Sequence, residues 1–212
     1  MQDPGADVID RVTGYWNLYG RIALGVLAAV VAVGAVAFFV LRARAASEEL
    51  AAGQLAEANL RFWQGDYGRS LQIARQVSEQ YASTRSGVEA LRLAGDDAFW
   101  NGDFKFAASQ YRRYLDKTRA GVVSDAVRRS YAYALESSLE YRAAADAYES
   151  LVGKFDRESS AEFLAASARC YRALGQTAEA AKRLRRLLDE FGETPYANIA
   201  RVHLGEITGG SS

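Results

Sequence analysis

Residues 95–114 read GDDAFWNGDFKFAASQYRRY and contain one unit of a pattern that runs through most of the chain. At the centre of this unit, residues 102–104 (Gly-Asp-Phe) have the composition of a turn between two helices. Gly95 lies seven positions before the turn and Ala107 five positions after it. Small residues at both places let two helices approach to the roughly 8 to 10 Å of a close helix crossing. The unit therefore predicts a helical hairpin.

The same unit recurs at a nearly constant interval. Related turns begin at Gly65, Gly102, Leu139 and Gly175, in steps of 37, 37 and 36 residues. The small positions keep this register: Ala58, Gly95, Ala132 and Ala168 before the turns, and Ser70, Ala107, Ala144 and Ala180 after them. A fixed period of this length is typical of solenoids, in which each hairpin buries part of its apolar face against the next. We therefore predict an all-α fold with an α-solenoid of about four hairpins.

The register also predicts where the helices lie. First helices are expected at 46–64, 86–101, 123–137 and 160–174, and second helices at 67–81, 104–118, 141–155 and 177–191. A last helix at 196–207 would cap the open apolar end of the stack. With the segment described next, the expected organisation is a short N-terminal arm (1–21), a transmembrane helix (22–41), the repeat domain (42–207) and a disordered tail (208–212).

Residues 22–41 form an uncharged stretch of 20 residues, of which twelve are Ile, Leu, Val or Phe. A helix of this length spans about 30 Å, the thickness of the hydrocarbon core of a bilayer. Tyr15, Trp16 and Tyr19 precede it, where aromatic rings favour the headgroup zone. A cleaved signal peptide is the alternative, but the stretch exceeds a signal h-region of about 7 to 15 residues. Ile22 to Leu41 is thus predicted to be a retained membrane anchor.

Composition excludes several classes of function. The chain has 212 residues, with 26 Lys and Arg balanced by 26 Asp and Glu, whereas a general nucleic-acid binder needs a basic excess. Its one cysteine, Cys170, and one histidine, His203, cannot form a Cys- or His-rich metal site, and Cys170 is expected to be buried and inert. A phosphate-binding loop and a nucleophile motif are both missing from the sequence. We predict no enzyme activity, no cofactor and no small-molecule substrate.

The charged clusters are interpreted as surface features. Asp96 and Asp97 are adjacent, so on a helix they diverge by about 100° and cannot serve one substrate; both are expected to be solvated or to face a groove. The arginine clusters around Arg112, Arg128 and Arg183 are interleaved with acidic residues and are expected to form local ion pairs.

The repeat resembles the tetratricopeptide repeat (TPR), which has a Gly-Asp-Tyr turn flanked by small residues. Residues 47–207 carry the likeness, although Leu139 replaces the turn glycine of the third repeat. The resemblance implies a concave, partner-binding surface lined by first helices. Placed on this register, that surface would contain Asn59, Phe62, Arg92, Asp96, Phe99, Arg129, Tyr133, Glu136, Arg169 and Arg172. The alternative is that these side chains only fill gaps between helices.

The order of parts resembles the ancillary SecYEG translocon subunit family (YfgM-like) of bacteria. The likeness rests on residues 15–21 (YWNLYGR), which lead directly into the anchor. It implies a cytoplasmic N-terminus and a periplasmic repeat domain at the inner membrane. Translocon subunits, periplasmic chaperones or unfolded clients would be the partners. Two alternatives remain open: a scaffold for another envelope complex, such as outer-membrane protein insertion or cell division, and a sugar-processing enzyme that uses Glu136 near Asp96.

Overall fold

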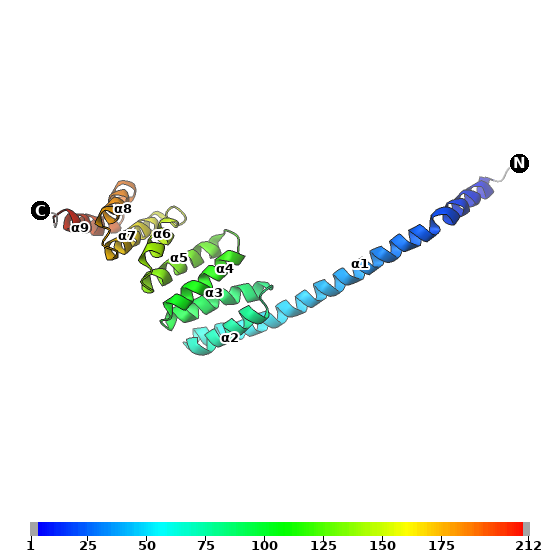
Figure 1. The fold of residues 1–212 in the computed structure, drawn as a ribbon, viewed down its shortest axis with the longest axis horizontal. Helices are drawn as coiled ribbons and strands as arrows, with labels where there is room; N and C mark the ends of the chain where they lie inside the picture. Colours follow the sequence, from blue (N-terminus) through cyan, green and yellow to red (C-terminus); the bar gives the residue numbers. More distant parts are fainter. Residues whose placement is uncertain (1–3, 210–212) are drawn as a thin grey trace. The chain divides into compact units, whose positions relative to one another are not determined.

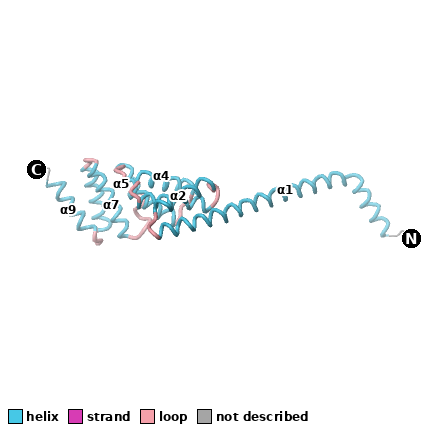
Figure 2. The backbone as a smooth tube through the Cα atoms, turned by 90° about the horizontal axis from the view of Figure 1, so that it is seen from below, coloured by secondary structure: helices cyan, strands magenta, loops and turns pink. Residues whose placement is uncertain are grey.

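The computed structural model describes residues 4–209, and the regular structure in that range is entirely helical (Figures 1 and 2). The helices are α1 (Pro4–Trp63), α2 (Tyr67–Gln80), α3 (Arg85–Trp100), α4 (Phe104–Lys117), α5 (Val122–Ser137), α6 (Tyr141–Glu149), α7 (Arg157–Ala173), α8 (Thr177–Phe191) and α9 (Tyr196–Gly209). The chain divides after Glu49 into two units, which are described separately.

The first unit, as far as it is described, consists of the N-terminal part of α1. The side chains described between Ile22 and Leu41 are all exposed. Within residues 4–209, α1 is the one helix long and apolar enough to cross a membrane. Tyr15, Trp16 and Tyr19 are exposed on the same helix, and the rings of Tyr15 and Tyr19 stack at 6.4 Å. The side chains of residues 17 and 18, within the stretch 15–21 that precedes the predicted anchor, lie outside those described. Residues 210–212 of the predicted tail also lie outside the described residues.

The second unit is a stack of helical hairpins that begins at Leu50. From α2 to α9, each helix packs against the helix that follows it in the chain, and α7 also contacts α9 (Figure 1). The observed helices match the expected hairpins with their turns in the expected places. The α-solenoid prediction is confirmed.

The four hairpin turns share one backbone conformation. Gly65, Gly102 and Gly175 adopt φ values of +78°, +80° and +70°, and Leu139 adopts +66°. This left-handed region is open to glycine and costs other residues energy, which explains why glycine recurs at the turns. The residue after the glycine caps the next helix in two repeats: Asp66 accepts a hydrogen bond from the Arg69 amide, and Asp103 accepts one from the Phe106 amide. The Gly-Asp pair therefore ends one helix and starts the next.

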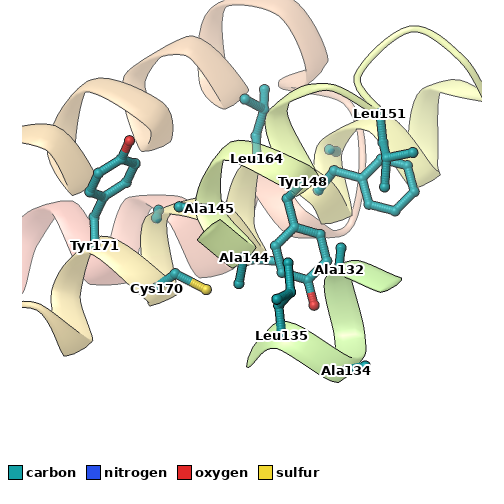
Figure 3. Packing of buried hydrophobic residues seen from close by; sticks show 14 of the residues in the cluster. Ala132, Ala134, Leu135, Ala144, Ala145, Tyr148, Leu151, Leu164, Cys170 and Tyr171 are labelled. Atoms are coloured by element: carbon teal, nitrogen blue, oxygen red, sulfur yellow. The ribbon is translucent and has the colours of Figure 1, made fainter. Parts of the chain in front are cut away.

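The small residues beside the turns are all buried, which confirms their predicted role in close helix contact. Larger residues fill the space that remains, nine and twelve positions after each turn. They are Tyr111, Tyr148 and Leu184 in the first set, and Val77, Tyr114, Leu151 and Leu187 in the second. Figure 3 shows the Tyr148 ring among Ala132, Leu135 and Ala144, at the centre of the third hairpin.

The buried apolar residues form two clusters of different composition. The larger cluster runs from α3 to α9 and contains the aromatic residues Tyr111, Tyr148 and Phe163. The smaller cluster lies in the first hairpin and its neighbour α3, and five of its eight members are alanines. Its members are Ala51, Leu55, Ala58, Ala74, Val77, Ala90, Leu93 and Ala94.

Three helix boundaries differ from expectation. The first repeat helix does not begin at 46 but is the continuation of α1, and α9 extends to Gly209 within the segment expected to be disordered. Helix α6 was expected to reach 155 but ends at Glu149. Gly153 then adopts φ +81°, and its amide donates to the hydroxyl of Ser160 in the next helix. This loop keeps Leu151 buried without continuing the helix.

Replacing Leu139 by glycine is expected to stabilise the repeat domain by about 0.5–1 kcal/mol. The change removes a left-handed backbone penalty of about 1–2 kcal/mol, and the greater freedom of glycine in the unfolded chain offsets part of the gain. Little packing is lost, because Leu139 is 68% exposed. Urea unfolding of the full chain in detergent micelles measures the change. Leu139→Ala keeps the strained φ and is the control; an equal gain in both variants would contradict this explanation.

Replacing Gly95 by alanine is expected to destabilise the domain by about 1–3 kcal/mol, the usual cost of overpacking a core. A Cβ atom at Gly95 would lie 2.5 Å from Cε1 of the buried Tyr111 ring. Gly53→Ala is the matched control, because a Cβ atom there meets nothing within 4 Å. The same unfolding measurement applies, and a Gly95→Ala protein as stable as Gly53→Ala would show that the ring yields freely.

Candidate functional site

The candidate interaction surface is the first-helix face, formed by side chains of α3, α5 and α7. Polar contacts join α5 to α7 and α7 to α9 on this face. Between α5 and α7, the Tyr133 hydroxyl donates to Glu162 at 2.8 Å. Arg169 donates to both carboxylate oxygens of Glu136, at 2.6 and 2.8 Å. Between α7 and α9, Arg172 donates to Glu206 at 3.0 Å. These polar contacts join successive repeats along one face.

Glu136 is held in its charged form by its neighbours. Burial alone would raise the pKa of Glu136, but hydrogen bonds from Arg169 and from the Tyr148 hydroxyl outweigh it and lower the pKa. Correspondingly, burial and the bond to Glu136 raise the pKa of Tyr148 far above its ordinary value. Burial also raises the pKa of Tyr133 to about 12, with the bond to Glu162 adding to the effect. Both phenols therefore remain protonated donors at neutral pH.

A second network lies on α3. Arg92 forms ion pairs with Glu89 and Asp96, and the Tyr111 hydroxyl of α4 donates to Asp96 at 2.8 Å. Burial raises the pKa of Asp96, and the charge of Arg92 and the hydrogen bond from Tyr111 oppose that rise. The network fixes the Asp96 carboxylate against the second helix of its own repeat.

A cavity of about 190 Å³ opens beside this network, between α3, α4 and α5. Its lining residues are Asp96, Phe99, Trp100, Tyr111, Ser130 and Tyr133. Three of the ten residues predicted for the partner surface, Asp96, Phe99 and Tyr133, thus meet at one place. The other three lining residues were not predicted for the surface. Trp100 directly follows the predicted Phe99, and Tyr111 lies nine positions after its turn, as Tyr148 does in the next repeat, whereas Ser130 carries no sequence signal.

The remaining predicted residues are spread along the domain. Glu136 and Arg169 pair with each other, and Arg172 lies on the same face one turn further along α7. The others have local partners: Asn59 donates to the Leu55 carbonyl, Phe62 packs on Tyr67, and the Arg129 guanidinium lies over the Phe155 ring. Asn59, Phe62 and Arg129 make these contacts within their own repeats, and their place on a partner surface stays a prediction.

Asp97 corrects the sequence interpretation, since it is neither solvated nor in a groove. Its side chain is fully buried, and Oδ2 lies 2.8 Å from the hydroxyl oxygen of Ser70. That hydroxyl also lies 2.9 Å from the carbonyl oxygen of Ala58. A serine hydroxyl has a single proton, so both contacts are satisfied when Asp97 is protonated and donates to Ser70, which donates to Ala58. Burial accordingly raises the pKa of Asp97 to about 7.

The arrangement of the other reactive groups gives no support to the enzymatic alternative. Asp96 is ion-paired with Arg92 and Glu136 with Arg169, so the two carboxylates do not form the free pair that sugar hydrolysis requires. Cys170 is buried, as predicted, and burial raises its pKa to about 12, which disfavours the reactive thiolate. Among the described residues, no group of three or more His, Cys, Asp or Glu side chains is placed to hold a metal.

The fold defines the protein as a TPR-like α-solenoid. One similar solved structure is a Podosopora anserina protein described as a kinesin light chain with nearly identical TPR-like repeats. It matches this chain with a TM-score of 0.56 and 18% identity, over 76% of this chain and 86% of that one. A double mutant of MamA from RS-1 matches with a TM-score of 0.59 at 14% identity, over 76% of this chain and 85% of that one. The apo form of RapI matches with a TM-score of 0.57 at 14% identity, over 76% of this chain and 64% of that one. No protein-family model and no curated protein sequence matches the chain.

The buried acid makes the stability of the repeat domain depend on pH. The pKa of Asp97 rises from 3.8 to about 7 on folding, so its favourable contribution is complete below about pH 4 and is lost as the pH rises through 7. Asp97→Asn mimics the protonated acid. It is expected to become more stable than the wild type as pH rises from 4 to 8, by up to about 4 kcal/mol.

Urea unfolding of the full chain in detergent micelles at several pH values measures this difference. Asp103→Asn makes the same exchange at an exposed position and controls for the loss of one carboxylate. A constant difference between Asp97→Asn and wild type across the range would show that Asp97 is already ionised in the folded protein.

Proposed function

We propose that this protein is a membrane-anchored scaffold of the bacterial inner membrane that binds protein partners through the first-helix face of its repeats. One observation carries the proposal: α1 contains both an exposed apolar segment of membrane-spanning length and the first helix of a TPR-like solenoid. Tethering a repeat domain to a membrane raises its effective concentration near other membrane proteins. Even a weak interaction surface then suffices for function.

We further propose that the partners belong to protein translocation or to the periplasmic chaperone network. The support is the resemblance to the ancillary SecYEG subunit family, which implies a cytoplasmic N-terminus and a periplasmic repeat domain. Charge does not decide the orientation, because Arg11 and Arg21 on one side of the anchor balance Arg42 and Arg44 on the other. Translocon subunits, chaperones and unfolded segments emerging from the translocon are the expected ligands.

A second candidate is an assembly scaffold for another envelope complex, such as outer-membrane protein insertion or the division machinery. The segments between hairpins, at 81–87 and 191–196, favour it, because they resemble those of outer-membrane assembly lipoproteins. No cysteine follows the apolar stretch in the way a lipoprotein requires, so the protein would act from the inner membrane.

Crosslinking on spheroplasts with a membrane-impermeant reagent tests location and partner together. We expect the repeat domain to react and translocon subunits or periplasmic chaperones to be recovered. Arg172→Ala, on the first-helix face, should reduce recovery several-fold, while Arg112→Ala, on the exposed side of the second helix α4, should not. Recovery of division or outer-membrane assembly proteins instead would support the second candidate, and no reaction of the repeat domain would contradict the periplasmic location.

A further inference from the structure

The cavity between α3, α4 and α5 lies where the second and third repeats carry Asp96 and Ser130. In the register of 37 residues, Asp96 corresponds to Tyr133 of the next repeat, whose ring packs against Tyr148 at 5.8 Å. Ser130 corresponds in the same way to Leu93 of the preceding repeat, which is buried. The position of Asp96 holds Asn59 in the first repeat and Arg169 in the fourth, and the position of Ser130 holds Ala56 and Ala166. About 190 Å³ is left open beside Asp96 and Ser130.

The walls of this cavity are aromatic. Phe99, Trp100, Tyr111 and Tyr133 contribute four rings, and two of these residues are fixed by hydrogen bonds, Tyr111 to Asp96 and Tyr133 to Glu162. Trp100 stands 63% exposed, and its ring stacks on that of Tyr67 at 5.9 Å. The faces of aromatic rings are negatively polarised and attract cations.

The charges beside the cavity leave a negative excess. Arg92 is shared between two carboxylates, Glu89 and Asp96, so one negative charge is not neutralised within that network. Next to Tyr133, the charges of Glu162 and Arg129 balance each other and leave the excess unchanged. A site with aromatic walls and an excess carboxylate favours a ligand that has both an apolar stem and a positive head.

We propose that this cavity accepts an arginine side chain from an extended segment of the partner protein. Its volume fits one long side chain and falls below the roughly 300 Å³ at which small-molecule sites begin. The alkyl stem would lie against the rings, and the guanidinium would reach Asp96. The proposal rests on the proposed scaffold function and specifies its ligand: a basic segment, with one arginine anchored between the second and third repeats.

The three tryptophans of the chain allow a direct test with 5-fluorotryptophan and ¹⁹F NMR, on the full-length protein in detergent micelles. Substitution of each tryptophan in turn assigns the resonances of Trp16, Trp63 and Trp100. The probes are the N-acetyl methylamides of arginine, norleucine and glutamate. We expect the arginine amide to shift the Trp100 resonance saturably, with little effect on Trp63 and Trp16. Norleucine and glutamate amides should bind at least about fivefold more weakly.

Asp96→Asn should weaken binding of the arginine amide about fivefold. Asp66→Asn, at an exposed helix cap in the first repeat, should leave this binding unchanged. Unchanged ¹⁹F dispersion verifies that each variant folds. A Trp100 shift as large with norleucine as with arginine would overturn the cationic ligand but leave the scaffold function intact. No Trp100 shift with the arginine amide up to about 50 mM would overturn the site itself. Failure of the crosslinking experiment with a positive result here would instead reject the proposed partners.

Discussion

The close approach of two helices at a single pair of small residues governs the structure of each repeat. Once Ala132 and Ala144 bring their helices together, the Tyr148 ring fills the space beside the contact. The left-handed residue of the turn sets the angle at which the second helix returns. Every hairpin obeys the same constraint, so the hairpins stack in register, and their first helices meet along one face.

That face is polar but already ordered. The Glu136–Arg169 pair and the Tyr133–Glu162 bond connect α5 to α7 before any partner arrives. Exposed ion pairs of this kind add little stability, but they hold long side chains in defined positions. A partner therefore meets a surface whose ordering cost is largely met by the fold. The open cavity beside Asp96 is one place along this face where side-chain packing is left incomplete, and a smaller one lies beside Arg169 and Arg172.

The period, the turns and the small positions were all predictable from sequence, because they follow from spacing that repeats four times. Interactions that occur only once were not predictable. Nothing in the pair Asp96-Asp97 indicates that one carboxylate would be buried against Ser70, since this depends on how α3 is rotated against α2. The early end of α6 likewise depends on the bond between Gly153 and Ser160. Residue type and register selected Asp96, Phe99 and Tyr133, which line one cavity, but the gap beside Ser130 appears only in three dimensions.

The alanine-rich cluster of the first hairpin has a consequence for how the solenoid comes apart. A stack in which each unit contacts only its neighbours opens from its ends, and the end that buries less side-chain volume opens first. Ala74 occupies the place that Tyr111, Tyr148 and Leu184 fill elsewhere, so α2 loses less on detaching than α4, α6 or α8. Among the four second helices, α2 would thus detach first under mechanical load or heat, while the aromatic centre of the array keeps its shape.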